Sequence, residues 1–307
     1  MTIKSKSMDG VIEKHFAQKI VSQKQLMGGY TFNTWLLCLS KGQKVVFRYS
    51  PDFATGSGRE IIIADVFRRE KFFYDSVNAA IGHICPEVYV IDETKENFET
   101  SFQIAEYLEG TTLDLCFDNL SDEQKSAVHY RHGEIAAGVN KLEIDEQHPY
   151  ILSRGTWKDF FATRLEERLT PLVELGLITA AQIESILGNV AKLRIENKRS
   201  FLHLDMRFAN MIYNEGNIFL IDAENSEFGD PLFELAVFDI NDYLTPEFLS
   251  GYTNVSGAVP DLSSELFNFY KLERLALILY VFIVEADDEK LAKHFLRKFE
   301  EVKSKVL

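Results

Sequence analysis

The sequence predicts an α+β fold in two lobes, with a small antiparallel β-sheet in the N-terminal lobe and a larger, mainly helical C-terminal lobe. The chain of 307 residues is long enough for each lobe to bury its own core. Short β-branched and aromatic runs gather in the first third, and helical stretches follow Gly110. We therefore expect an N-terminal lobe over residues 1–105, a hinge over 106–112 and a C-terminal lobe over 113–307.

The N-terminal lobe should begin with a helix from Ser7 to about Gln25, because Ser7 can cap it and apolar residues recur at helical spacing. Next, Lys41-Gly42 lies between the β-rich runs "TWLLCLS" and "KVVFRYS" and predicts a hairpin turn. A polar loop over residues 51–61 leads into a long helical segment, "IIIADVFRREKFFYDSVNAAI". The runs "EVYVID" and "FQIAEYL" predict two further strands of the same sheet.

The C-terminal lobe should consist mainly of helices. Three stretches have helical patterns: "SDEQKSAVHYRHGEIAAGVNKL", "WKDFFATRLEERLTPLVELG" and "TAAQIESILGNVAKLRIENK". A strand-rich segment over residues 201–224 follows them, and the chain is helical again from Leu232.

The composition argues against several classes of protein. Cys38, Cys85 and Cys116 are widely spaced and form no CxxC pair, which argues against a disulfide framework and a thiolate zinc site. No apolar run reaches membrane-spanning length and the N-terminus lacks an apolar signal core, so we expect a cytoplasmic protein with no membrane partner. The net charge of −14 disfavours nucleic-acid binding and is compatible with a cationic small substrate.

Polar side chains that suit a metal lie in "HLDMRFANMIYNEGNIFLID", residues 203–222. "MIY-NEGN-IFLID" predicts a hairpin that carries Asn210 at its entry and Asp222 at its exit, so antiparallel pairing brings both to one end. Asp205 lies on the loop that leads in and can reach the same pocket. Two carboxylates and an amide suit Mg²⁺, a hard ion that takes oxygen ligands and shares its shell with phosphates. The sequence therefore predicts that Asn210 and Asp222 bind Mg²⁺.

The same segment predicts phosphoryl transfer. In that chemistry a loop Asp orients the acceptor hydroxyl, while an Asn and a second Asp hold the metals that bridge the nucleotide phosphates. The spacing His-x-Asp-x-x-x-x-Asn agrees with a kinase catalytic loop, with Asp205 as the base. We expect His203 to brace this loop by hydrogen bonding, and the role of Glu224 stays open.

This region resembles the signature of the aminoglycoside phosphotransferase and choline kinase superfamily of small-molecule kinases. The pattern is His-x-Asp, then Asn, a hairpin, Ile-Asp and a Gly-Asp-Pro-Leu segment before a helix, which Gly229-Asp230-Pro231-Leu232 supplies here. The resemblance implies a protein-kinase-like fold and transfer of the γ-phosphate of ATP or GTP, with Mg²⁺, to a hydroxyl of a small acceptor. We expect Asp230 to have a structural role, hydrogen-bonding the catalytic loop, and not to contact the ligand.

The resemblance extends to the N-terminal lobe. "GGYTFN" is similar to the family's nucleotide loop, and it places Gly28, Gly29 and Asn33 against phosphate. Arg48 stands where the family carries a phosphate-holding Lys or Arg, and Glu70 is the candidate for its usual partner.

The segment "AEYLEGTTL" resembles the family's hinge. Main-chain groups around Glu106, Tyr107 and Leu108 would then pair with adenine.

The acceptor and some rival functions stay open. An aminoglycoside-type antibiotic, and hence a resistance kinase, is the leading prediction; the alternative is a metabolic kinase for choline, thiamine or a sugar-like metabolite. A non-catalytic nucleotide-binding relative, or a hydrolase that uses His203, Asp205 and Asp222 around a transition metal, are the rivals. Asp239 and Asp242 could face the acceptor or could simply end a helix. No protein partner is implied, and a monomer or simple homodimer is expected.

Overall fold

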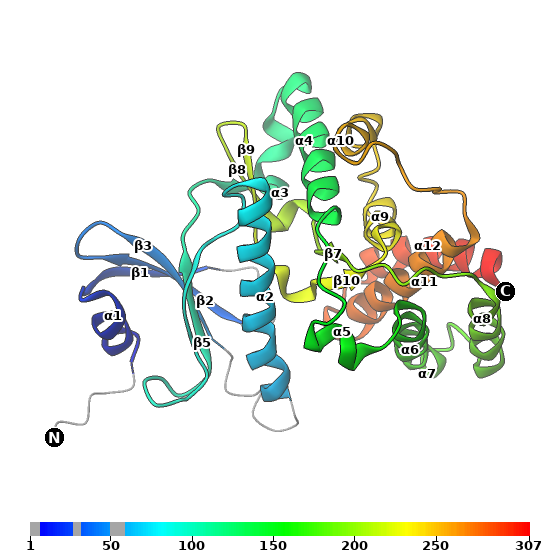
Figure 1. Cartoon of the computed structure of the whole chain (residues 1–307), viewed down its shortest axis with the longest axis horizontal. Coiled ribbons are helices and arrows are strands. Elements are labelled where there is room, and N and C mark those ends of the chain that lie inside the picture. The colour runs from blue at the N-terminus through cyan, green and yellow to red at the C-terminus, as the bar shows by residue number, and fades with distance from the viewer. Residues whose placement is uncertain (1–6, 27–31, 50–58) are drawn as a thin grey trace. The chain divides into compact units, whose positions relative to one another are not determined.

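A computed structural model of the chain describes residues 7–26, 32–49 and 59–307. Its contacts divide the chain into two compact units, Met1–Asp118 with Phe208–Glu224 and Asn119–Arg207 with Asn225–Leu307. Figure 1 labels most of the elements of both units. The predicted lobe boundaries at residues 105 and 113, and the hinge between them, stay predictions.

The first unit is built on a five-stranded antiparallel sheet with the strand order β1-β2-β3-β5-β4. The strands are β1 (Ile20–Leu26), β2 (Asn33–Leu39), β3 (Lys44–Tyr49), β4 (Val88–Asp92) and β5 (Phe102–Glu106). The predicted turn between β2 and β3 is present, because Gly42 has a φ of 87° and the amide of Leu39 donates to Gln43 O at 2.8 Å.

The first helix is shorter than the sequence predicts. Helix α1 (Met8–Phe16) is capped by Ser7, whose Oγ accepts from the Gly10 amide at 3.3 Å, and it ends where Ala17 adopts a left-handed conformation. The expected continuation to Gln25 is wrong, since Ile20–Leu26 forms the edge strand β1. The reason is that an edge strand exposes most of its side chains, so the polar run in β1 lacks the alternation that identifies a half-buried strand.

The sheet buries a different set of side chains on each face. α1 covers one face with Val11 and Ile12, which pack on apolar residues of the inner strands: Leu37, Leu39, Val45, Phe47, Phe102 and Ile104. The long helix α2 (Arg59–Ile81) contributes Val66 and Phe67 to a second cluster. Because side chains alternate along a strand, the neighbour of Phe47 in β3, Arg48, points toward α2.

A small second sheet completes the first unit and confirms the predicted hairpin. It has the order β6-β8-β9, with β6 (Thr111–Thr112), β8 (Met211–Asn214) and β9 (Asn217–Leu220). The turn residues Glu215 and Gly216 both have positive φ, 49° and 89°, as a two-residue type I′ hairpin requires. The short helices α3 (Leu113–Cys116) and η3 (Phe208–Asn210) lie beside this sheet.

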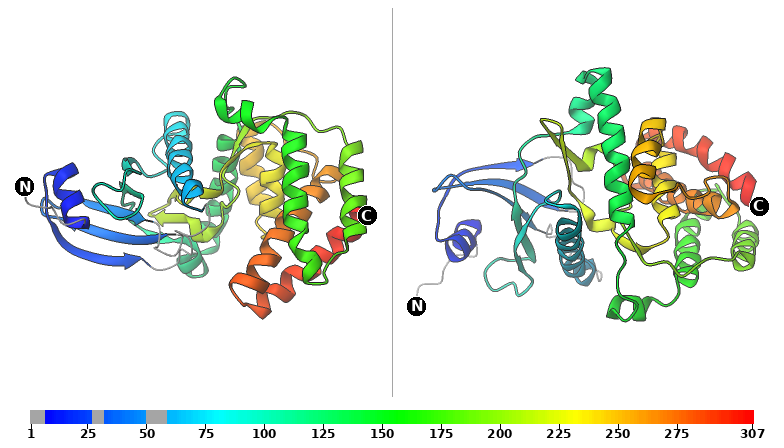
Figure 2. Two further views of the ribbon diagram at one scale, coloured as in Figure 1. Left: turned by 90° about the horizontal axis from the view of Figure 1, so that it is seen from below. Right: turned by 45° about the horizontal axis from the view of Figure 1, so that its top comes forward.

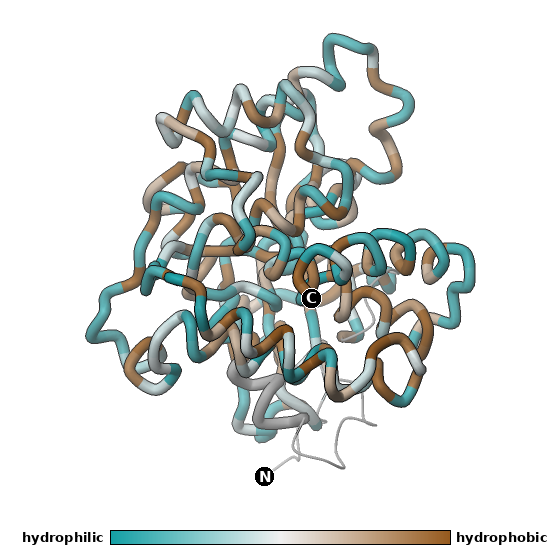
Figure 3. Tube along the Cα trace, turned by 90° about the vertical axis from the view of Figure 1, so that its right-hand side faces the viewer, coloured by the Kyte–Doolittle hydropathy of each residue, from teal (hydrophilic) through white to brown (hydrophobic). Residues whose placement is uncertain are grey.

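The second unit is mainly helical, as the sequence predicts. It also contains one pair of short strands, β7 (Ser200–Leu202) and β10 (Glu227–Gly229), and the strand β10 was not predicted. Its longer helices are α4 (Asp122–Asn140), α6 (Trp157–Leu169), α8 (Ala180–Lys192), α9 (Pro231–Ile240), α10 (Pro246–Ser256), α11 (Glu265–Tyr280) and α12 (Glu289–Val306). The shorter ones are α5 (Pro149–Arg154), α7 (Pro171–Glu174) and a π-helical turn, Val281–Glu285. Figure 2 shows α4 and α10 side by side, and Figure 3 shows hydrophobic and hydrophilic residues alternating along the helical turns.

An aromatic cluster forms the centre of the second unit. The buried Trp157 donates through Nε1 to Tyr270 Oη at 2.8 Å, and both rings lie against Phe161 and Phe233. A side chain at Gly229 would place its Cβ 2.3 Å from the Trp157 ring, so the first residue of the Gly-Asp-Pro-Leu segment is a packing requirement. No helix in the described part of the chain is both long and apolar enough to span a bilayer.

Candidate active site

The predicted ion pair of the first unit is present. Arg48 on β3 donates from Nη1 to both carboxylate oxygens of Glu70 on α2, at 2.9 and 2.8 Å. The Glu70 side chain is 0% exposed, and Tyr74, one helical turn on, donates its hydroxyl to Glu70 Oε1 at 2.9 Å. Burial alone would lower the pKa of Arg48, but the negative charges of Glu70 and Asp222 outweigh it and raise that pKa.

Asp222 lies in the same group of charges. Its Oδ1 accepts from Arg48 Nη2 at 3.1 Å, while its side chain stays 31% exposed. Asp222 has a φ of 62°, a left-handed conformation that Asp and Asn tolerate better than most residues. The backbone after it is tied to α2 as well, since the amide of Ala223 donates to Tyr74 Oη at 3.3 Å and Arg69 Nη2 donates to Glu224 O at 2.8 Å.

Asn210 lies at the same end of the β8–β9 hairpin as Asp222. The register pairs Met211 with Leu220, and just beyond that pair the Ile221 amide donates to Asn210 O at 3.0 Å. The hairpin therefore brings the residue before β8 and the residues after β9 together, as antiparallel pairing requires. The Asn210 side chain is buried.

The structure says less about the other residues that were predicted to bind nucleotide. Gly28 and Gly29 lie outside the described residues. Asn33 begins β2, directly beside the strand pair Thr34–Arg48. Phe32, just before it, lies against the guanidinium of Arg48, with its ring centroid 4.7 Å from Cζ.

At the predicted hinge, Glu106 ends β5 and its carboxylate binds His83 Nε2 at 2.7 Å. Leu108 is buried, and its main chain makes no hydrogen bond with any residue that the structure describes.

The predicted catalytic loop lies in the second unit. His203 is buried, and its Nδ1 accepts a hydrogen bond from the Asp205 amide at 3.3 Å. Leu204 between them has a φ of 60°, which is strained for a residue with a branched side chain. The Asp205 carboxylate is part-exposed and pairs with Arg207, whose Nε lies 3.1 Å from Oδ1.

Glu234 holds this strained loop, and sequence reasoning did not identify it. Its carboxylate accepts from the amides of His203 and Leu204, at 2.6 and 2.9 Å. Burial raises the pKa of Glu234 to about 7, although the two amide donors oppose the rise. A single acidic residue inside the apolar run "PLFELAVF" was the available signal, because a buried carboxylate needs hydrogen-bond partners.

Asp230 has structural contacts, as expected, but they are not with the catalytic loop. Its Oδ1 accepts from the Leu232 amide at 3.0 Å, which caps α9, and from Lys198 at 3.1 Å. The hydrogen bonds to the catalytic loop come from Glu234 instead, so that expectation for Asp230 is wrong.

Asp239, in the last turn of α9, and Asp242, just beyond that helix, are engaged in ion pairs. Asp239 pairs with Lys271 at 3.0 Å, and Asp242 pairs with Lys298 at 2.8 Å. Their contacts are those of a stabilised helix end, which was the simpler of the two readings left open by the sequence.

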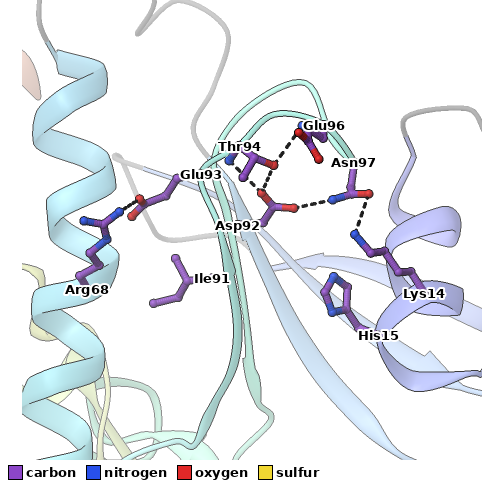
Figure 4. Close-up of a pocket in the computed structure, with 9 residues that line it drawn as sticks. All are labelled: Lys14, His15, Arg68, Ile91, Asp92, Glu93, Thr94, Glu96 and Asn97. Carbon is purple, nitrogen blue, oxygen red and sulfur yellow. Dashed lines mark hydrogen bonds and ion pairs between the residues drawn. The ribbon is translucent and has the colours of Figure 1, made fainter.

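A cavity of about 420 Å³ in the first unit contains none of the predicted site residues. Figure 4 shows it around the β4–β5 connection, with Asp92 held between Thr94 and Asn97 and with Arg68 turned to Glu93. Both oxygens of Asp92 are already bonded, Oδ1 to Thr94 and Oδ2 to Asn97 at 2.7 Å. These contacts support the connecting loop and leave no uncommitted carboxylate oxygen on Asp92 for a ligand.

Comparisons with known proteins identify the family and the fold. The model of a family described as a phosphotransferase enzyme family matches residues 22–262. No curated protein matches the sequence significantly.

Solved structures match along the whole chain. A thermostable mutant of aminoglycoside phosphotransferase APH(4)-Ia, in a ternary complex with ADP and hygromycin B, is 18% identical, with 97% of this chain and 98% of that chain covered and a TM-score of 0.67. The APH(2")-IIa ternary complex with streptomycin and ATP is also 18% identical, with coverage of 97% and 96% and a TM-score of 0.64. A Thermobifida fusca YX-ER1 protein assigned as a fructosamine-3-kinase is 13% identical, with 99% of each chain covered and a TM-score of 0.67. At these identities the likeness shows the fold, and it confirms the predicted protein-kinase-like α+β class.

Proposed function

The chain belongs to the phosphotransferase enzyme family, and on that premise we propose that it is a kinase that moves the γ-phosphate of ATP or GTP to a hydroxyl group of a small molecule. Asp205 accepts the hydroxyl proton while the hydroxyl oxygen bonds to the γ-phosphorus. The bond from that phosphorus to the bridging oxygen breaks, and nucleoside diphosphate leaves. His203 orients this loop through the hydrogen bond from the Asp205 amide to its Nδ1.

The nucleotide residues of the proposal are in the first unit. Arg48, positioned by Glu70, holds the α- and β-phosphates. Hinge main-chain groups at Glu106 and Leu108 bind the adenine base. The role of Gly28, Gly29 and Asn33 against the phosphates stays a prediction.

Asn210 and Asp222 would hold Mg²⁺, which when bound neutralises charge on the transferring phosphates. Their donor set fits this ion, since Mg²⁺ takes oxygen ligands and needs only one or two carboxylates from the protein. The charge balance fits too, because Glu70 and Asp222 both pair with Arg48 and leave one negative charge that a cation would offset. Among the described residues, no group of three or more His, Cys, Asp or Glu side chains could hold a metal ion.

The buried contact of Arg48 with Glu70 and Asp222 is the observation that carries the proposal. It joins a strand, a helix and the hairpin end through one guanidinium. Burying charged side chains costs free energy of desolvation. Clusters of buried charged groups with shifted pKa values are common at functional sites.

The acceptor is the open part of the proposal. Hygromycin B and streptomycin are present in two of the similar structures, and the assignment of the T. fusca protein points to a metabolite. The test is an acceptor screen with aminoglycosides, choline, thiamine and sugars, scored by nucleoside diphosphate formation. At least one acceptor should stimulate diphosphate formation in the wild type and not in Asp205→Asn. Nucleotide turnover that no acceptor changes would contradict the proposal.

A further inference from the structure

Three arginines of the second unit surround one buried carboxylate. Arg164 and Arg168 on α6, and Arg274 on α11, approach the carboxylate oxygens of Glu273 to 2.6, 3.7 and 3.8 Å. Only the contact of Arg164 is a hydrogen bond. We call these four residues the arginine cluster, in which three positive charges face a single negative one.

Other carboxylates near the arginine cluster form no ion pair with it in the described part of the chain, although Glu167 and Glu285 act to raise the pKa of Arg168. Three more carboxylates have partners elsewhere. Asp205 pairs with Arg207, and Glu234 accepts from the two amides of the catalytic loop. After Glu273, Glu227 is the carboxylate whose charge most raises the pKa of Arg164. Glu227 accepts from the Tyr150 hydroxyl at 2.6 Å and pairs with Arg154.

The arginine cluster also contains donors that lack an acceptor. The Arg274 side chain is 6% exposed, yet its Nε and Nη1 have no hydrogen-bond partner in the described part of the chain. Arg168 Nε is also buried and also lacks a hydrogen-bond partner in the described part of the chain. Burial and repulsion from Arg164 lower the pKa of both guanidiniums. One acceptor of the cluster, Glu273 Oε2, also lacks a partner in the described part of the chain. A single carboxylate oxygen has two lone pairs and cannot satisfy three donors, so the donors still indicate that a group with further acceptor oxygens is missing.

The location of the arginine cluster connects it to the proposed reaction. Arg274 Nη2 donates to Leu204 O at 3.3 Å, and Leu204 directly precedes Asp205. Arg168 is 38% exposed, so the cluster reaches solvent on one side. A small molecule bound there would lie beside the residue that is to take its hydroxyl proton.

We propose that the arginine cluster binds a carboxylate or phosphate group of the acceptor, so that the substrate is a small hydroxylated anion and not a polycationic aminoglycoside. The planar guanidinium matches both groups, which accept paired hydrogen bonds from it. This inference rests on the proposed kinase function for its choice of substrate. The anion site itself can be tested without catalysis.

The first test measures anion binding by thermal unfolding in chloride and in inorganic phosphate at equal ionic strength. Arg168→Gln removes one of the three cations. Arg131→Gln is the matched control, because Arg131 is 43% exposed and pairs with Glu134 on its own helix. Phosphate should raise the Tm of the wild type and of Arg131→Gln more than that of Arg168→Gln. Phosphate that binds near Arg48 would act equally on all three proteins.

The same comparison separates a ligand site from a structural one. In chloride, Arg168→Gln should unfold at no lower a temperature than the wild type, because it relieves repulsion among the guanidiniums. A Tm several degrees lower, with no loss of the phosphate effect, would mean that Arg168 only supports the fold and would overturn the inference.

The second test compares neutral acceptors with close analogues that carry an anionic group: glycerol with glycerate, sorbitol with gluconate, and glycerol with glycerol phosphate. The anionic member should have a kcat/KM at least about 10-fold higher, since charge-assisted hydrogen bonds are the strong ones. That advantage should disappear in Arg168→Gln and persist in Arg131→Gln. The carboxylate and phosphate pairs show which of the two groups is preferred.

The two proposals fail in different ways. One outcome is that neutral and cationic acceptors have the same kcat/KM as anionic ones, and that phosphate stabilises all three proteins equally. In that case the anion site is wrong and the kinase function stands. If no acceptor is phosphorylated but phosphate still stabilises only the proteins that retain Arg168, the kinase function is wrong and the anion site stands.

Discussion

Replacing Arg48 with methionine should destabilise the first unit strongly, because it removes the partner of a buried charge. Glu70 is 0% exposed and would keep only the hydrogen bond from the Tyr74 hydroxyl. Breaking a buried ion pair by removing one partner typically costs about 3–5 kcal/mol. The retained hydrogen bond places our expectation at the lower end, about 3 kcal/mol.

Two further variants make this prediction specific. Asp222→Asn should cost about 1 kcal/mol or less, because that carboxylate is 31% exposed and asparagine tolerates the left-handed backbone. Adding Glu70→Gln to Arg48→Met should restore most of the lost stability, since glutamine still accepts from Tyr74 and carries no charge.

Urea denaturation of the four proteins gives these free energies of unfolding. Hydrogen exchange of peptides from β3 and α2 checks that the loss lies in the first unit. A loss below about 1 kcal/mol in Arg48→Met, or a double variant as unstable as the single one, would refute the reasoning about the buried pair.

Three further predictions concern the catalytic loop and the metal. Asp205→Asn should lower phosphate transfer by about 10²–10⁴-fold while nucleotide KM stays near its wild-type value, and wild-type turnover would show that Asp205 is not the base. Asp222→Asn should remove the Mg²⁺ dependence of nucleotide affinity, and an unchanged magnesium titration would count against the metal assignment. Glu234 has a folded-state pKa raised from 4.5 to about 7, so its contribution to stability is present below about pH 4.5 and is lost as pH rises through 7. Compared with Glu234→Gln, the free energy of unfolding of the wild type should therefore fall by about 3 kcal/mol between pH 4.5 and 8, and parallel pH profiles would contradict this.

Local chemistry made the central hairpin predictable from the sequence. Its turn and its β-branched flanks determine the register that brings Asn210 beside the end of β9. The contact of Arg48 with Glu70 was predictable for a different reason, because the resemblance to a known family supplied a pairing between elements 22 residues apart.

Other features depend on contacts that no local pattern records. Strand β1 was mistaken for helix because its side chains are mostly exposed at a sheet edge, and only pairing with β2 identifies it as a strand. Glu234 binds a loop 31 residues away, and the arginine cluster joins α6 to α11. In both cases the sequence shows a charged residue in a helix, and only the fold shows what that charge faces.

The most direct test of the central claim is mass spectrometry of an acceptor that stimulates nucleoside diphosphate formation, after incubation with ATP, Mg²⁺ and the wild-type protein. The kinase function predicts one phosphoryl group on a hydroxyl of that acceptor, in an amount equal to the diphosphate formed. Inorganic phosphate in that amount, with the acceptor unmodified, would contradict it.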